Sequence, residues 1–296
     1  MDKIKAIIQL ARVFTLLAPL IGGFVFGLWG YKDANASLPS LVGFLKIVLV
    51  GIILAICNFH SNVLNQIFDI DIDKLHPVKR HRPIPSGKIQ PEEAYSVAIA
   101  LLLIAMILST ISFGPTFTLS IAFIAVFSWL YNAPPFRLKK RLFWSNLGIS
   151  FPRGGLGIVS AYSAFASPYN PAIYVAIVYF ALYVFGTNTL KDFADEQYDR
   201  IAGVRNFVTV WGRETSSIIV GAFTIIPFAW LLTVHYIGYL PLNYIVLTPI
   251  ILSLGMVYLL IKGAKKTSLE GNSVLWLIFY FQFALMLITY ALPYLI

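Results

Sequence analysis

Aspartates gathered in two short segments are the residues of this sequence best suited to chemistry. Asp and Glu make up only 13 of the 296 residues, yet residues 65–73 and 192–199 each hold three aspartates. Each segment ends an apolar run long enough to cross a bilayer, where an uncompensated carboxylate is costly. Carboxylates placed close together repel unless cations bridge them, and hard oxygen ligands suit Mg²⁺. The pattern therefore favours a magnesium site that meets a substrate phosphate.

Helical spacing places the polar residues of each segment on one side of a helix. At about 100° per residue, the first stripe covers an arc of ~80° and the second an arc of ~60°. The stripes are Asn58, Asn62, Asn65, Asp69 and Asp73, and Asn188, Asp192, Asp195 and Asp199. Asp71 lies almost opposite Asp69 and is predicted to be solvated. If the stripes face each other, they can bind roughly two or three Mg²⁺ ions. The predicted metal ligands are Asn65, Asp69, Asp73, Asp192, Asp195 and Asp199.

Basic segments next to the aspartates offer partners for a phosphate. Residues 80–88 combine two arginines with a Pro/Ser/Gly turn, so that guanidinium groups and backbone N–H groups can both bind phosphate oxygens. Residues 131–140 add further cations, including Lys139. Arg153 is the only guanidinium deep inside a predicted span, and an intramembrane charge is a functional candidate. Arg82, Lys139 and Arg153 are therefore candidate diphosphate ligands.

Composition indicates an all-α protein that spans a membrane many times. The chain is 58% hydrophobic and 12% charged, and its mean hydropathy is +0.79. Its apolar runs reach the ~20 residues that a spanning helix needs. A soluble helical protein would need far more polar surface. We expect one domain, residues 1–296, with about nine spans, near residues 9–31, 40–64, 94–113, 115–134, 143–165, 171–190, 216–238, 243–262 and 273–295.

The distribution of basic residues predicts the orientation. All of the 22 Lys and Arg residues except Lys32, Lys46 and Arg153 lie in the N-terminus or after an even-numbered span, including Lys262, Lys265 and Lys266 after the eighth. The positive-inside rule therefore makes the N-terminus and the loops near 74–93 and 191–215 cytoplasmic. The net charge of +9 is explained by this topology and by anionic lipid headgroups, so no nucleic-acid partner is expected.

Cysteine and histidine usage excludes other kinds of site. The single cysteine, Cys57, allows neither an internal disulfide nor a thiolate cluster. The four histidines lack metal-ligand spacing, so no zinc site is predicted. His60 lies off the polar stripe and is predicted to be packed or hydrogen-bonded.

Three segments resemble motifs of the UbiA superfamily of intramembrane prenyltransferases. They are Asn65-Gln66-x-x-Asp69-x-x-x-Asp73 with Arg82-Pro-Ile-Pro-Ser-Gly87, Tyr131 to Lys139 with its Pro-Pro pair, and Lys191-Asp192-x-x-Asp195-x-x-x-Asp199-x-x-x-Gly203. The resemblance covers residues 10–215, and its motif form is similar to homogentisate-type and chlorophyll-synthase-like members. Gln66 stands where many members carry Asp, but it lies ~100° from Asn65 on the helix and need not bind metal.

The resemblance implies a bundle around a central cavity, similar to soluble isoprenyl diphosphate synthases. It implies that Asp69, Asp195 and Asp199 are catalytic and that Tyr131 and Lys191 join the diphosphate site. The implied reaction moves an isoprenyl group from an allylic diphosphate to a lipophilic or aromatic acceptor, with Mg²⁺ or, in its place, Mn²⁺. Quinone, tetrapyrrole and ether-lipid biosynthesis all use such a step.

Two alternative functions fit parts of the pattern. A secondary transporter could bind Na⁺, H⁺ or Ca²⁺ through intramembrane aspartates, but its site is expected near the bilayer midplane and does not explain the basic loops. A CDP-alcohol phosphotransferase would carry D-G-x-x-A-R before spaced aspartates, and the sequence lacks that signature.

Overall fold

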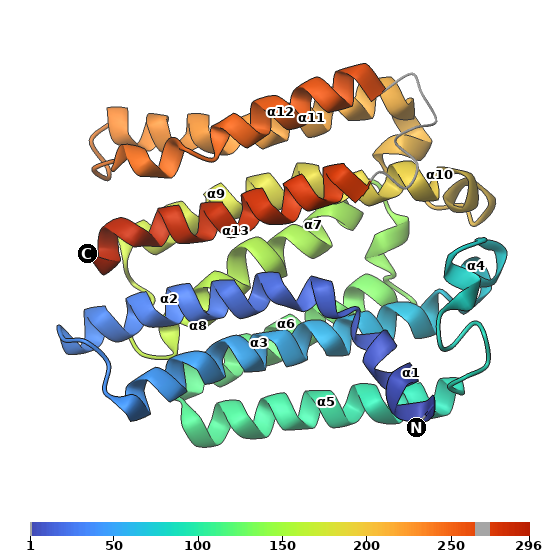
Figure 1. Ribbon diagram of the computed structural model, residues 1–296, viewed down its shortest axis with the longest axis horizontal. Coiled ribbons are helices and arrows are strands. Elements are labelled where there is room, and N and C mark those ends of the chain that lie inside the picture. Colours follow the sequence, from blue (N-terminus) through green and yellow to red (C-terminus); the bar gives the residue numbers. More distant parts are fainter. Residues whose placement is uncertain (1, 264–272) are drawn as a thin grey trace.

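The computed structural model describes residues 2–263 and 273–296, which form a bundle of long helices (Figure 1). Lys265 and Lys266 lie outside the described residues. No strand occurs in the described part of the chain. The α-helices are α1 (Asp2–Ala11), α2 (Leu17–Asn35), α3 (Leu41–Phe68), α4 (Ile70–Leu75), α5 (Pro91–Ser112), α6 (Pro115–Asn132), α7 (Trp144–Ser150), α8 (Gly157–Ser163), α9 (Pro171–Thr187), α10 (Asp192–Ile201), α11 (Phe207–Tyr236), α12 (Ile250–Gly263) and α13 (Ser273–Leu295). Short helical segments connect them: η1 (Val13–Leu16), η2 (Lys79–His81), η3 (Leu138–Lys140), η5 (Asn188–Lys191) and η6 (Tyr244–Leu247) are 3-10 helices, and η4 (Phe151–Leu156) is a π-helix.

Local sequence signals fix where the long helices begin. Proline stands at the start of α5, α6 and α9, where its missing N–H costs no intrahelical hydrogen bond. The Asn170 side chain accepts from Ala172 N at 2.9 Å, and that of Asn206 accepts from Thr209 N at 2.9 Å, so each caps a helix start. These boundaries place the motif residues at helix ends.

Eight helices of the described residues are long and apolar enough to span a membrane. The expected span at 143–165 is also helical but consists of three pieces, α7, η4 and α8. Pro152 interrupts its hydrogen bonding, and a Cβ on Gly154 would come within 2.6 Å of Ala181 N, so α9 packs closely here. The predicted all-α membrane-spanning bundle is confirmed, and the predicted count of about nine spans is approximate, because eight helices of the described residues meet the criterion. The two termini lie at opposite ends of the bundle (Figure 1).

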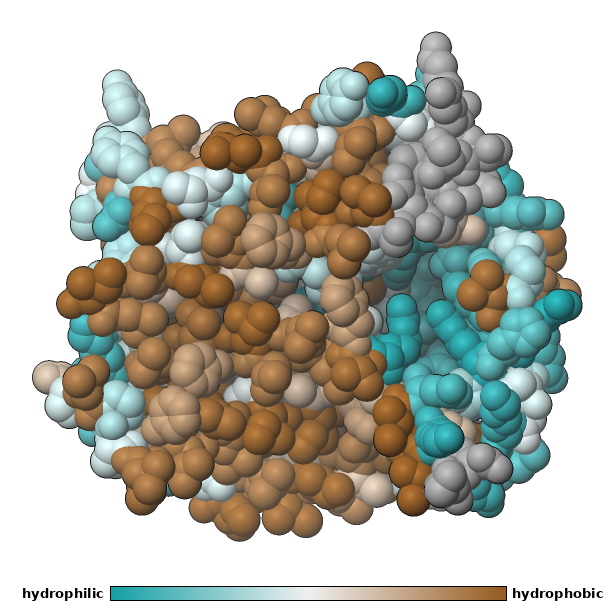
Figure 2. Space-filling model, in the orientation of Figure 1, coloured by the Kyte–Doolittle hydropathy of each residue, from teal (hydrophilic) through white to brown (hydrophobic). Residues whose placement is uncertain are grey.

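The outer surface has an apolar body and one strongly polar end. Apolar side chains cover most of the face in Figure 2, and hydrophilic ones gather where α4, α10 and the N-terminus lie. Outward residues such as Ile107 and Phe281 are 57% and 64% exposed, which suits contact with lipid. The chain is therefore an integral membrane protein with its basic loops at one end.

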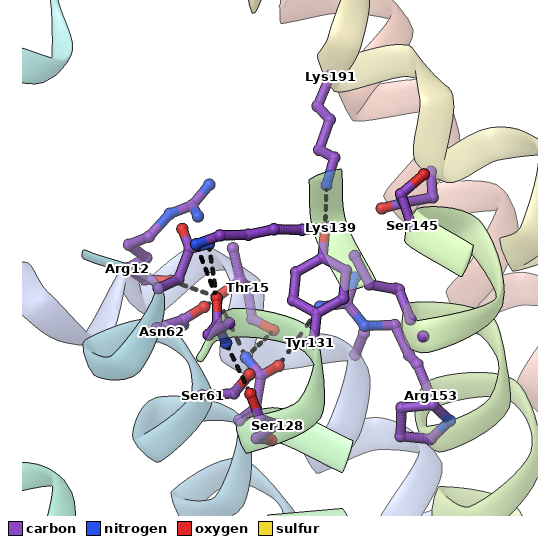
Figure 3. Close-up of a pocket in the computed structure, with 18 of the residues that line it drawn as sticks. Arg12, Thr15, Ser61, Asn62, Ser128, Tyr131, Lys139, Ser145, Arg153 and Lys191 are labelled. Carbon is purple, nitrogen blue, oxygen red and sulfur yellow. Dashed lines mark hydrogen bonds between the residues drawn. The ribbon is translucent and has the colours of Figure 1, made fainter. Parts of the chain in front are cut away.

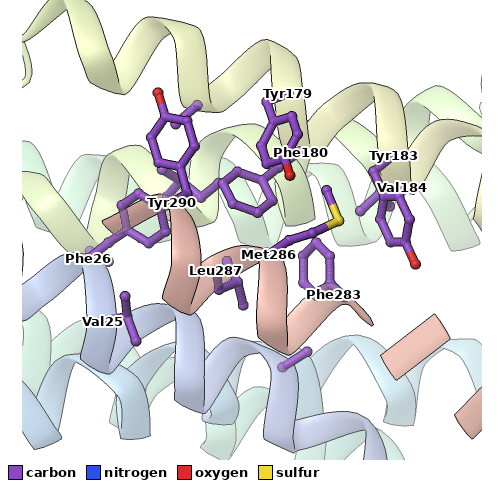
Figure 4. Close-up of a cluster of buried hydrophobic side chains, with 14 of the residues drawn as sticks. Val25, Phe26, Tyr179, Phe180, Tyr183, Val184, Phe283, Met286, Leu287 and Tyr290 are labelled. Atoms are coloured by element: carbon purple, nitrogen blue, oxygen red, sulfur yellow. The ribbon is translucent and has the colours of Figure 1, made fainter. Parts of the chain in front are cut away.

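Aromatic side chains from α2, α9 and α13 form the centre of the core. Phe26, Phe180 and Tyr290 are buried, with ring centroids 5.8 Å apart for both Phe26–Phe180 and Phe180–Tyr290 (Figure 4). Tyr183 stacks on Phe283 at 6.0 Å. The cluster ties helices that are far apart in the sequence.

Candidate active site

A cavity of about 580 Å³ opens at the polar end of the bundle and extends between the spans. Every site residue predicted from the sequence lines it: Asn65, Asp69, Asp73, Arg82, Tyr131, Lys139, Arg153, Lys191, Asp192, Asp195 and Asp199. The two aspartate segments, far apart in the sequence, therefore meet at one opening. The hollow at the polar end of Figure 2 is this region.

The first aspartate segment does not lie on one continuous helix. α3 ends at Phe68, and Asp69 has φ −108° and ψ 8° before α4 begins. The prediction of a regular helix through the segment is wrong because the Arg137 side chain donates to Phe68 O at 2.5 Å and satisfies a carbonyl at the helix end. Asp73 N still donates to Asp69 O at 2.7 Å. Asp69 and Asp73 thus both face the cavity, while Asp71 is exposed as predicted.

Asp69 sits in a network of lysine and amide groups. Lys139 Nζ lies 2.7 Å from Asp69 Oδ1 and donates to Asn132 Oδ1 at 3.1 Å. Asn65 Nδ2 donates to both Asp69 Oδ2 and Asn132 Oδ1, each at 3.1 Å. Burial lowers the pKa of Lys139 to about 8, although Asp69 opposes the shift. Burial therefore disfavours the charged form of Lys139. When charged, its ammonium group is placed to bind a further anion.

Asp73 pairs with the predicted diphosphate ligand of the following loop. Arg82 Nη1 lies 2.7 Å from Asp73 Oδ2, and Asp73 is only 2% exposed. Burial raises the pKa of Asp73, while Arg82 and Lys79 oppose that shift. The loop holds its shape through a turn in which Ile89 N donates to Pro83 O and Gly87 takes φ 77°, a value that glycine adopts without a Cβ clash.

The second aspartate segment lies on α10, directly after the 3-10 turn η5. Asp192 is 5% exposed, and Asp199 Oδ2 accepts from Asn206 Nδ2 at 2.8 Å. Asp195 Oδ1 lies 2.5 Å from Lys79 Nζ and 3.5 Å from His76 Nε2. His76 Nδ1 accepts from Val78 N at 3.1 Å, so Nε2 is the ring nitrogen that can donate to Asp195. The loop after the first segment thus contacts the second.

Hydrogen bonds from a neighbouring face of α10 hold this helix against α11. Glu196 Oε2 accepts from Arg213 Nε at 2.7 Å, and Glu196 Oε1 lies 2.9 Å from Arg200 Nη2. Arg213 also donates to Phe193 O at 3.0 Å, and Arg200 donates to Thr209 O at 2.8 Å. These bonds orient α10 so that its aspartates turn toward the cavity.

Further cations line the cavity below its opening (Figure 3). Lys191 Nζ donates to the Tyr131 hydroxyl at 2.8 Å. Arg153, on the π-helical turn η4, donates to Asn58 Oδ1 at 3.4 Å. Both predicted groups therefore lie in the cavity wall, each with a polar partner.

Two asparagines of the polar stripe on α3 bind the segment that precedes α2. Asn62 Nδ2 donates to Ala11 O at 2.8 Å and to Thr15 Oγ1 at 2.9 Å, and Asn58 Nδ2 donates to Thr15 O at 3.1 Å. These bonds seat the N-terminal segment against α3. Asn58 and Asn62 also line the cavity, together with Asn65 and the aspartates after it.

Arg12 is a cavity residue that sequence reasoning missed. It has φ 49°, in the left-handed region, and directs its side chain into the cavity (Figure 3). Gln66, which is 1% exposed, donates to Leu10 O at 3.1 Å and fixes the preceding turn. A guanidinium near the start of the first predicted span, 9–31, was the available signal.

Lys79, His76, Asn132 and Asn206 are also site residues that spacing alone did not single out. Each is polar and lies within a few residues of a motif. His60, by contrast, is buried, and its Nδ1 lies 2.9 Å from Ala98 O, which confirms a packed histidine away from the cavity.

The oxygen-rich donor set suits Mg²⁺ by its ligand chemistry. Within residues 2–263 and 273–296, no three His, Cys, Asp or Glu side chains lie close enough to hold one ion. Asp69, Asp73 and Asp195 contact a lysine or an arginine instead. These cations are within reach of any phosphate that enters the opening.

Comparison with known proteins identifies the family. The model of the UbiA prenyltransferase family matches residues 23–283. The chain belongs to the UbiA prenyltransferase family. It is therefore a prenyltransferase, and the resemblance inferred from the motifs is confirmed.

Named relatives of this UbiA-family chain are synthases of different products. The chain is 30% identical to digeranylgeranylglyceryl phosphate synthase of Methanocaldococcus jannaschii over 283 residues, 94% of this chain and 93% of the relative. It is 27% identical to the bacteriochlorophyll synthase 33 kDa chain of Rhodobacter capsulatus over 72% of this chain and 69% of the relative. A solved UbiA homologue from Archaeoglobus fulgidus bound to GPP and Mg²⁺ has a TM-score of 0.75 and 20% identity, covering 98% and 99% of the two chains. That likeness confirms the fold.

Proposed function

We propose that this UbiA-family enzyme is Mg²⁺-dependent and moves an isoprenyl group from an allylic diphosphate to a lipophilic or aromatic acceptor. The proposed metal ligands are Asn65, Asp69, Asp73, Asp192, Asp195 and Asp199, all of which line the cavity. The solved homologue with GPP and Mg²⁺ supports this choice of donor and metal. Mn²⁺ is expected to substitute because it accepts the same oxygen ligands.

The basic residues of the opening would bind the diphosphate and stabilise it as the leaving group. Lys139 and Arg82 contact aspartates across 2.7 Å, so a diphosphate bound between the two segments lies within their reach. Bound Mg²⁺ would supply charge neutralisation as the allylic C–O bond breaks. Lys191, oriented by Tyr131, and Arg153 would add preorganised positive charge where the diphosphate develops its charge.

The apolar walls of the cavity would hold the isoprenyl chain and exclude water. Ala18, Leu54, Phe283 and Leu287 line the cavity below the polar opening. Water is thereby kept from the allylic cation that forms when diphosphate leaves. The acceptor then attacks the first carbon of the chain, and Asp195 or Asp199 would take its proton.

The observation that carries the proposal is that one cavity joins both carboxylate segments, several cations and an apolar interior. A transporter needs its cation site near the middle of the spans, whereas these aspartates lie at the polar end, on α4 and α10 (Figure 1). We further propose that this end, with the N-terminus, is cytoplasmic, because the basic loops gather there.

Diphosphate release tests the proposal. The purified protein is incubated with geranyl or geranylgeranyl diphosphate, Mg²⁺ and a panel of acceptors comprising aromatic acids, naphthoates, tetrapyrroles and glycerol phosphate ethers. We expect release with at least one acceptor and its loss in excess EDTA, restored by Mg²⁺. Undiminished turnover in EDTA would contradict the metal assignment, and failure with every donor would contradict the donor assignment.

A further inference from the structure

Below its polar opening, the cavity continues as an apolar channel between α2, α3 and α13. Its wall includes Ala18, Gly22, Leu54, Phe283 and Leu287. Along α3 the cavity extends from Asp69 to Leu54, a depth of roughly 20 Å at a rise of ~1.5 Å per residue. The five residues named above are apolar or lack a side chain, so the part of the cavity that they line suits a hydrocarbon chain.

At Phe283 and Leu287 the channel borders the close-packed aromatic core. Phe283 and Leu287 are 2% and 1% exposed, and Phe26, Phe180 and Tyr290 lie directly behind them (Figure 4). The Phe180 ring centroid is 5.8 Å from both the Phe283 and the Tyr290 centroids. Close-packed protein interiors deform little, so this aromatic cluster limits how far an isoprenyl chain can enter.

Two adjacent glycines on α2 differ in what surrounds them. A Cβ on Gly23 would come within 2.5 Å of Gly51 Cα, so Gly23 is required for α2 to pack on α3. A Cβ on Gly22 would meet only Leu287, at 3.6 Å, which is ordinary contact. Helix packing therefore does not require a glycine at position 22, and a side chain added there would contact Leu287 in the cavity wall.

We propose that Gly22 and Leu287 set the longest isoprenyl chain that the enzyme accepts. They form the narrow end of the channel, and the diphosphate site at the opening fixes where the chain begins. A side chain at position 22 shortens the space, and a smaller residue at position 287 lengthens it. The inference rests on the proposed function, because the length is measured from a diphosphate held at the polar opening.

Donor selectivity tests the inference. Gly22→Leu and Leu287→Ala are compared with Gly255→Leu, a control on α12 where no atom lies within 4 Å of the added Cβ. The value of kcat/KM is measured for geranyl, farnesyl and geranylgeranyl diphosphate with one acceptor. We expect Gly22→Leu to lower the ratio of geranylgeranyl to geranyl turnover by about 10-fold or more. Leu287→Ala raises that ratio, and the control leaves it unchanged.

The outcomes separate the inference from the proposed function. An unchanged ratio in both channel variants overturns the inference alone, because the chain then takes another route. General damage to the fold cannot shift the ratio in opposite directions, and Leu287→Ala decides the matter if Gly22→Leu turns over no donor. Failure of the unmodified protein to release diphosphate from any of the three donors overturns the proposed function, and the inference with it.

Discussion

The two aspartate segments face one opening but are held there in different ways. The first is broken at Asp69, and its inward carboxylates contact cations of neighbouring loops, Lys139 and Arg82. The second lies on a short helix clamped to α11 through Glu196 and Arg213, and Asp199 accepts from an amide rather than a cation. The first segment is thus positioned by charge and the second by a rigid helix.

This difference bears on how the two segments would respond to substrate. In the first, cations can be shared with an incoming phosphate, so charge balance changes when the donor binds. In the second, the hydrogen bonds of α10 to α11 keep the helix that carries the carboxylates in place independently of the donor. Lys79 joins the two regions, because it belongs to the loop after the first segment and contacts Asp195 at 2.5 Å.

The largest effect is expected when one proposed metal ligand is removed from either region. Asp69→Ala and Asp195→Ala should each lower kcat/KM by more than about 10³-fold, beyond the loss of a single electrostatic donor. Asp71→Ala is the matched control, because Asp71 is exposed on the same short segment. Steady-state assays of diphosphate release measure all three. Equal losses at Asp69 and Asp71 would contradict the distinction between inward and outward aspartates.

A smaller effect is expected when the charge pairing of the first region is broken. Arg82→Ala should reduce turnover by roughly 10²–10³-fold, because a preorganised donor to the leaving group is lost. Arg82→Lys should recover only part, since a point charge does not reproduce the guanidinium fork. Melting temperatures of both variants report any effect of leaving Asp73 unpaired. Full activity of Arg82→Lys would indicate that charge alone matters at this position.

The smallest effect is expected when support for a carboxylate of the second region is removed. Asn206 donates to Asp199 at 2.8 Å, so Asn206→Ala should raise the Mg²⁺ concentration for half-maximal activity by about 10–100-fold. The kcat at saturating Mg²⁺ should change much less. A loss of kcat with an unaltered Mg²⁺ requirement would show that Asn206 does not act through a metal ligand.

Sequence patterns predicted the helical class and the membrane spans. Every site residue that they singled out lines the cavity. Spacing was sufficient for Asp192, Asp195 and Asp199 because α10 is a regular helix. It failed at Asp69, where a side chain from another loop, Arg137, ends α3. Arg12 and Asn206 were missed because their roles depend on tertiary contacts: the left-handed turn that directs Arg12, and the loop that brings Asn206 to Asp199.

The binding of a non-hydrolysable allylic diphosphate analogue tests the central claim most directly. Its affinity is measured by titration calorimetry with and without Mg²⁺, in the unmodified protein and in Asp195→Asn, which keeps the shape of the side chain but removes its charge. The account predicts tight binding that requires Mg²⁺ in the unmodified protein and is greatly weakened in Asp195→Asn. Equal affinity with and without Mg²⁺, or in both proteins, would contradict it.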